Sequence, residues 1–99
     1  MASTAIEDFL AALAVDRGAA ANTLAAYRRD LEGAAALVGP LEDVSRGDLA
    51  KLGEKWSGLA PATVARKASA LRQFFAFLED EGLRSDNPSA ALPRPAPRR

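Results

Sequence analysis

The chain has 99 residues, 13 basic and 13 acidic, with no cysteine and no histidine. Its length suits one small domain with a modest core, and the missing cysteine and histidine exclude disulfides, thiolate metal sites and the commonest general base. No apolar run approaches the roughly 20 residues that span a bilayer, so we expect a cytoplasmic protein without a membrane partner.

Helical periodicity in the first half of the chain predicts two helices. The first spans about residues 4–16, capped by Ser3 or Thr4 and ended by Gly18. The second spans about residues 22–38, with Asn22 as its N-cap and a stop at residues 39–40, Gly-Pro. Its apolar face includes Tyr27, for which we expect a structural role.

Two more helices are predicted in the second half. One spans about residues 46–55, with Ser45 and Asp48 forming a variant of the capping box and Trp56 as a core or lid residue. The other, the longest, spans about residues 61–81 and ends at Gly82. Its apolar stripe consists of Val64, Ala68, Leu71, Phe74, Phe75 and Leu78, and its opposite side of Thr63, Arg66, Ser69, Ala70 and Gln73. Phe77 lies on the polar side, where packing on a neighbouring helix is favoured over a partner protein.

The pattern as a whole predicts an all-α fold, a compact bundle of four main helices with antiparallel-like neighbours, because no segment alternates as a strand and the loops are short. We expect the folded domain to cover residues 1–87. Residues 88–99, which end in a basic, proline-rich tail, are expected to form a short C-terminal linker toward a further domain.

Charge is sorted along this neutral chain. The segment from Lys55 to Leu78 contains four basic residues and no acidic one. The basic residues are Lys55, Arg66, Lys67 and Arg72. Such a locally positive helix indicates a surface for a polyanion, most often nucleic acid, although a solvated helix face explains the charge equally well.

No set of residues indicates catalysis. The serines and threonines have no histidine to activate them, and there is no glycine-rich phosphate loop. Asp30 and Glu32 stand two apart on a predicted helix and therefore face different ways. We expect no catalytic residue, metal, cofactor or small-molecule substrate in this chain.

Two segments resemble a known family. Residues 22–31, Asn-Thr-Leu-Ala-Ala-Tyr-Arg-Arg-Asp-Leu, resemble the Asn-Thr-Leu-x-x-Tyr-x-x-Asp-Leu signature of tyrosine recombinases. Residues 63–78 resemble the fourth helix of that family's N-terminal domain, Thr-(Ile/Val)-x-Arg-x-Leu-Ser-Ala-Leu-Arg-x-Phe-(Phe/Tyr)-x-(Phe/Tyr)-Leu. The likeness is greatest to Xer-type recombinases, which resolve chromosome dimers, with phage and mobile-element integrases as near relatives. Ala68, where Leu is common, and Ala21, where Ser or Thr is common, depart from the pattern.

The resemblance implies a SAM-like core-binding domain that forms half of a C-shaped clamp on double-stranded DNA during DNA integration or recombination. Other recombinase protomers on the DNA are the implied protein partners. The catalytic arginines, lysine, histidines and tyrosine belong to a C-terminal domain, and this chain is expected to stop before them.

In the family the second and fourth helices approach the major groove. The DNA-binding residues expected here are Asn22, Thr23, Arg28, Arg29, Thr63, Arg66, Lys67, Ser69, Arg72 and Gln73. Arg66 is the best candidate for a base edge or a central phosphate. Lys67 and Arg72 flank the apolar stripe and suit backbone contacts or coverage of the core, and Arg28 is as well suited to an ion pair.

This prediction requires two neighbouring helices that present their cations outward. Burial of Arg66, or its neutralisation by a carboxylate, would contradict it. About five phosphate contacts would give a log–log salt slope near −4 to −5.

Other function classes stay open. A protein-interaction bundle would use Phe77 and the alanine-rich faces. A helix-turn-helix regulator fits poorly because the last helix is long, and an enzyme is opposed by the missing histidine. The sequence specifies neither the DNA target, nor a chromosomal or mobile-element role, nor the oligomeric state.

Overall fold

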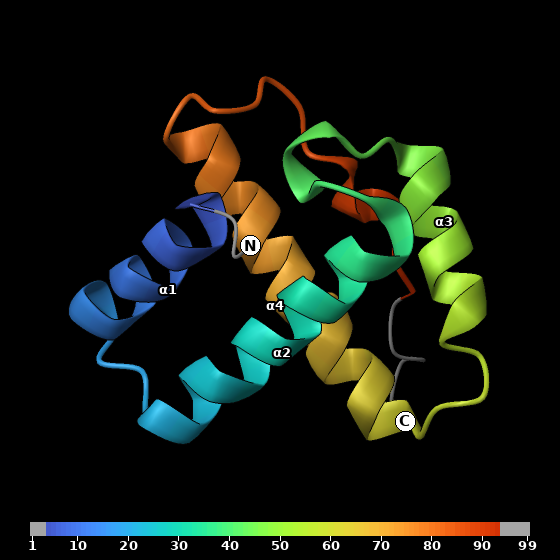
Figure 1. Cartoon of the computed structure of the whole chain (residues 1–99), viewed down its shortest axis with the longest axis horizontal. Coiled ribbons are helices and arrows are strands. Elements are labelled where there is room, and N and C mark those ends of the chain that lie inside the picture. The colour runs from blue at the N-terminus through green and yellow to red at the C-terminus, as the bar shows by residue number, and fades with distance from the viewer. Residues whose placement is uncertain (1–3, 94–99) are drawn as a thin grey trace, which may run out of the picture.

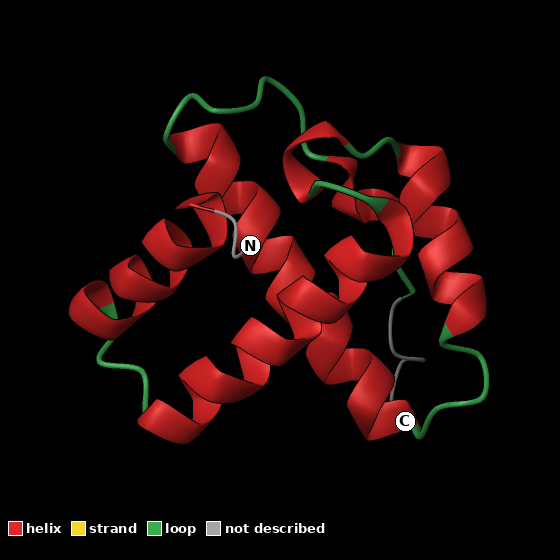
Figure 2. Cartoon of the chain, in the orientation of Figure 1, coloured by secondary structure: helices red, strands yellow, loops and turns green. Residues whose placement is uncertain are grey.

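The computed structural model describes residues 4–93 and contains, in that range, four α-helices and two short 3-10 helices. These are α1 (Thr4–Asp16), α2 (Ala21–Val38), η1 (Leu41–Asp43), α3 (Arg46–Lys55), α4 (Pro61–Asp80) and η2 (Pro88–Ala91). Figure 2 shows helices and loops and no strand in this part of the chain. The expected all-α class and the four main helices are confirmed. No helix within residues 4–93 is long and apolar enough to cross a membrane.

Local chemistry explains where α3 begins and where α4 ends, but not where α2 begins. Ser45 and Asp48 form the predicted capping box at the start of α3, and Gly82 has a φ of +71° directly after the C-cap of α4, where a side chain would be strained. The predicted cap of α2 is wrong, because α2 starts one residue earlier. Its N-cap is Ala20, which has no side-chain cap, and Asn22 lies within the first turn.

Helix α4 runs through the middle of the molecule, and α2 crosses it obliquely (Figure 1). Helix α1 contacts both α2 and α4, whereas α3 contacts α2 and η2. The expected antiparallel-like arrangement is therefore wrong: the helices cross each other. One physical consequence is that α4 is covered from several directions, so its apolar surface is wider than a single stripe.

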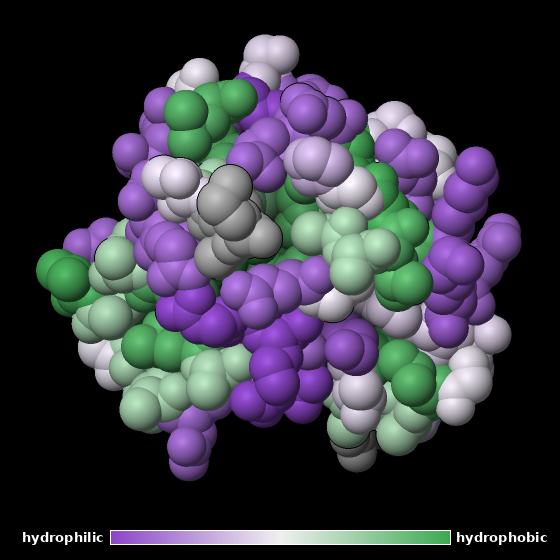
Figure 3. Space-filling view, in the orientation of Figure 1, coloured by the Kyte–Doolittle hydropathy of each residue, from purple (hydrophilic) through white to green (hydrophobic). Residues whose placement is uncertain are grey.

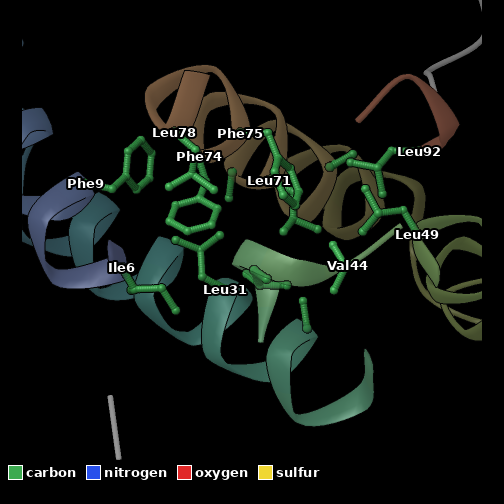
Figure 4. Packing of buried hydrophobic residues seen from close by; sticks show 14 of the residues in the cluster. Ile6, Phe9, Leu31, Val44, Leu49, Leu71, Phe74, Phe75, Leu78 and Leu92 are labelled. Carbon is green, nitrogen blue, oxygen red and sulfur yellow. The ribbon is translucent and has the colours of Figure 1, made fainter. Parts of the chain in front are cut away.

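The core forms between α1, α2 and α4 and continues to η1, α3 and Leu92, and Figure 4 shows its aromatic and aliphatic side chains packed together. The Phe9 ring packs against Phe74 and Phe77 at centroid distances of 5.6 and 5.7 Å. Phe77 thus packs on a neighbouring helix, as predicted, and Trp56 is a core residue, as predicted. Ala70, expected on the outer side of α4, is fully buried instead.

The chain after α4 folds back onto the domain. The Asn87 side chain accepts a hydrogen bond from the Ser89 amide, and η2 packs against α3 and α4. Pro88, Ser89 and Leu92, which lie in the expected linker, are buried against the helices. The rest of the expected linker, residues 94–99, lies outside the described residues.

Candidate nucleic-acid interface

A buried carboxylate lies at the crossing of α2 and α4. Asp30 of α2 accepts hydrogen bonds from Arg66 Nε and Nη2 at 2.9 Å each, and from Lys67 Nζ at 3.2 Å. The Asp30 side chain is 1% exposed, whereas that of Arg66 is 44% exposed. Hydrogen bonding and charge attraction to Asp30 raise the pKa of Arg66 above its ordinary value.

This ion pair contradicts part of the sequence-based prediction. Arg66 is exposed, as expected, but a carboxylate neutralises it, which is the condition stated above as contrary to an outward-facing free cation. The reason is tertiary: the oblique crossing sets Asp30 against residues that follow it by 36 and 37 positions in the chain.

The α2–α4 crossing nevertheless has a net positive charge. Two cations share one carboxylate, so Asp30, Arg66 and Lys67 together carry a net charge of +1. A guanidinium has five N–H donors, and Asp30 occupies the edge formed by Nε and Nη2. The Nη1–Nη2 edge makes no hydrogen bond within residues 4–93, so it is available to a second acceptor.

Two other residues expected to contact DNA, Ser69 and Gln73, make hydrogen bonds inside the domain. Gln73 Nε2 donates to Tyr27 Oη at 3.1 Å and to Ser69 Oγ at 3.0 Å. Arg17 Nη1 of the α1–α2 loop donates to Gln73 Oε1 at 3.2 Å. This polar network joins α4 to α2 and to the end of α1, and Tyr27 has the structural environment predicted for it.

Two of the arginines are also engaged. Arg28 of α2 pairs with Glu7 of α1, and the hydrogen bond that Arg28 donates to the Glu7 carboxylate raises the pKa of Arg28. Of the two alternatives for Arg28, the structure therefore contains the ion pair. Arg72 donates from Nη2 to the Pro93 carbonyl oxygen. A Cβ on Gly53 would lie 3.1 Å from the Pro93 ring, so α3 and α4 together hold the chain where it leaves the domain.

The remaining expected residues lie toward solvent. Arg29 is exposed and has no partner among residues 4–93, and Asn22 and Thr23 are exposed in the first turn of α2. The helical rise separates Asn22 from Asp30 by about 12 Å along the axis. Thr63 is half-buried near the start of α4. Hydrophilic side chains gather across the middle of this face, over the α2–α4 crossing (Figure 3).

Sequence reasoning missed two residues. Asp30 has a recognisable signal: it stands three positions after Tyr27 and four before Ala34, both on the inward face of α2, so helical spacing turns it toward α4. Arg84 has no such signal, because it lies in an irregular segment and its partners are backbone carbonyls of η1 and the residue that follows it. No cluster of metal-ligating side chains occurs among the described residues.

The sequence of this domain matches a known family over most of its length. Residues 6–82 match the model of the phage integrase N-terminal SAM-like domain, and the chain therefore belongs to that family. No solved structure matches it significantly.

Curated relatives identify the branch of the family. The chain is 72% identical to tyrosine recombinase XerC of Erythrobacter litoralis over 99% of its length, and 45% identical to tyrosine recombinase XerD of Brucella suis over 95%. It is 42% identical to XerC of Xanthomonas campestris over 97%. In each case it covers 32% of the relative, so it spans about a third of their length. The resemblance to the core-binding domain of Xer-type tyrosine recombinases is confirmed.

Proposed function

We propose that this domain binds double-stranded DNA as the N-terminal half-clamp of a Xer-type tyrosine recombinase, through α2 and α4. The observation that carries the proposal is the crossing of these helices, where Arg66 and Lys67 share one buried carboxylate and keep a net positive charge. Arg29 adds a second, unpaired cation on the outer side of α2. Membership of the SAM-like integrase family and the names of the relatives support the same function.

The structure narrows the proposed contacts. Arg29, Arg66 and Lys67 supply the charge, and Asn22, Thr23 and Thr63 add polar groups at the starts of the two helices, where backbone N–H groups favour phosphates. Ser69, Gln73, Arg72 and Arg28 are assigned instead to holding the helices and the C-terminal exit together.

This smaller set lowers the expected salt dependence. Arg29 and the net charge at the crossing amount to about two neutralised phosphates, so the log–log salt slope should be near −2. That value is shallower than the −4 to −5 expected if every basic residue of the two helices touched a phosphate.

The test is fluorescence anisotropy with this chain and a duplex recovered from a random-sequence library by repeated binding selection. We expect salt-sensitive binding that is weakened about tenfold by Arg66→Ala, if the guanidinium contacts a base through two hydrogen bonds. Lys51→Ala, on the exposed side of α3, is the matched control and should change affinity little. Binding that ignores salt, or no duplex recovered, would overturn the proposal in favour of a protein-interaction bundle.

We also propose that the longer protein carries the catalytic domain after the exit at Pro93, acts in DNA integration or chromosome dimer resolution, and assembles with other recombinase protomers on DNA. The chain covers about a third of its relatives, which leaves room for such a domain. A downstream Arg…Lys…His-x-x-Arg…Tyr set in the same reading frame would support this part, and a frame without it would overturn it.

A further inference from the structure

We propose, on the basis of the DNA-binding function above, that Asp30 is a positioning residue for DNA recognition: its buried carboxylate holds the guanidinium of Arg66 by one edge and turns the other edge toward the DNA. The two 2.9 Å hydrogen bonds from Nε and Nη2 form a parallel pair, which fixes the plane of the guanidinium as well as its place. Asp30 itself does not touch the DNA, because only 1% of its side chain is exposed.

The outer edge has a definite chemical preference. Nη1 keeps both of its N–H groups and Nη2 keeps one, so the exposed edge can donate two parallel hydrogen bonds. Such an edge suits two adjacent acceptor atoms, either O6 and N7 of a guanine in the major groove or two oxygens of a phosphate. A solvated arginine would present the same donors, but it would lose more conformational freedom on binding.

The burial of Asp30 explains why the arrangement is stable as a unit. A carboxylate removed from water is unfavourable unless it is paired and hydrogen-bonded, and Lys67 adds a third hydrogen bond at 3.2 Å. Asp30 is also the acidic position of the segment, residues 22–31, that resembles the recombinase signature. The acid on α2 and the arginine on α4 therefore act together, although they belong to separate motifs.

The experiment compares two variants that each remove one negative charge from α2. Asp30→Asn removes the acid that holds Arg66, whereas Glu32→Gln removes an exposed acid two residues later that makes no hydrogen bond to Arg66. Both variants raise the net charge by one, so any general electrostatic gain is equal. Affinity is measured by anisotropy for the selected duplex and for a scrambled duplex of the same length and composition.

We expect Asp30→Asn to bind the selected duplex about tenfold more weakly than Glu32→Gln, and this difference to vanish when both variants also carry Arg66→Ala. A difference confined to the selected duplex indicates a guanine edge, and an equal difference on both duplexes indicates a phosphate. Equal affinities of Asp30→Asn and Glu32→Gln on both duplexes would overturn the positioning role while leaving DNA binding intact.

A second variant keeps the inference testable if Asp30→Asn unfolds. Arg66→Lys retains the charge but lacks the planar fork, and its exposed position should leave the fold unchanged. We expect it to lose most of the affinity that Arg66→Ala loses, with an unchanged salt slope; affinity equal to that of the unmodified chain would overturn the positioning role. Failure of the unmodified chain to bind any duplex would overturn the proposed function itself. In that case the ¹⁵N resonance of Arg66 Nε, compared with Asp30→Asn, still shows whether the carboxylate holds the guanidinium.

Discussion

Two arginine–aspartate pairs in this domain have opposite arrangements. At the α2–α4 crossing the acid is buried, and the Arg66 side chain is 44% exposed. After α4 the arginine is the more buried partner: the Arg84 side chain is 11% exposed and the side chain of its partner Asp86 is 60% exposed. Arg84 donates to backbone carbonyls of η1 and the following residue and lies 5.4 Å from the centroid of the Phe75 ring.

The difference shows that the donors an arginine keeps for a ligand depend on which member of the ion pair is buried. A buried acid holds a cation at the surface, where its remaining donors face solvent. A buried arginine such as Arg84 donates its N–H groups to backbone carbonyls and stabilises loops, so it has no N–H donor facing a ligand. The number of basic residues on a helix therefore overestimates the number of cations without a partner in the domain, since Arg28 and Arg72 also have partners there.

The largest effect should follow removal of the buried arginine. Arg84→Met leaves the carbonyls of Leu41, Glu42 and Val44 without this donor, so we expect a loss of about 2–4 kcal/mol in the free energy of unfolding. Urea denaturation followed by circular dichroism measures it. Arg29→Met, at an exposed position, is the control and should stay within about 0.5 kcal/mol of the unmodified chain. Similar stabilities for the two variants would remove the distinction between the sites.

For the two acids, we expect substitution at the α2–α4 crossing to destabilise the domain more than substitution after α4. Asp30→Asn weakens three hydrogen bonds to cations and should cost about 1–3 kcal/mol in unfolding free energy. Asp86→Asn changes an exposed side chain, so its effect on the melting temperature should be smaller. The comparison would fail if Asp86→Asn destabilised the chain more than Asp30→Asn in the same melting experiment.

The salt dependence of DNA binding should differ between cations with and without a partner in the domain. Arg29→Ala removes an exposed cation without a partner in the described residues, and should reduce the magnitude of the log–log salt slope by about 1. Arg28→Ala removes a cation already paired with Glu7, and should change the slope less. Anisotropy across a salt series measures both, and a larger change for Arg28→Ala would reverse the assignment.

The smallest effect concerns pH. Hydrogen bonds from Ser45 lower the pKa of Asp48, and hydrogen bonding to Arg84 lowers that of Asp86, both from an ordinary value of 3.8. On acidification the unfolded chain therefore binds these protons first, so their contribution to stability is complete above the ordinary value and is lost as pH falls through the folded values. Melting temperatures between about pH 6 and pH 3 should decline, and Asp48→Asn should flatten the decline; an unchanged profile in that variant would contradict the assignment to Asp48.

Sequence reasoning succeeded where the cause is local. The spacing of apolar residues predicted all four helices. The residue types at helix ends predicted the capping box at Ser45 and the position of Gly82 after the last helix. The burial of Trp56 and the packing of Phe77 on a neighbouring helix were also predicted. The start of α2 was misplaced because no side-chain cap marks it: its N-cap is Ala20 and Asn22 lies inside the helix.

The family, the helices and the candidate helices of the interface were thus contained in the sequence, because periodicity, caps and motifs act over a few residues. The packing of the helices was not: the crossing of α2 over α4 sets Arg66 against Asp30, Ala70 is buried, and η2 packs on α3 and α4 with Pro88, Ser89 and Leu92 buried. These outcomes depend on contacts between residues far apart in the chain, and the relative orientation of packed helices, which no local pattern specifies, sets those contacts.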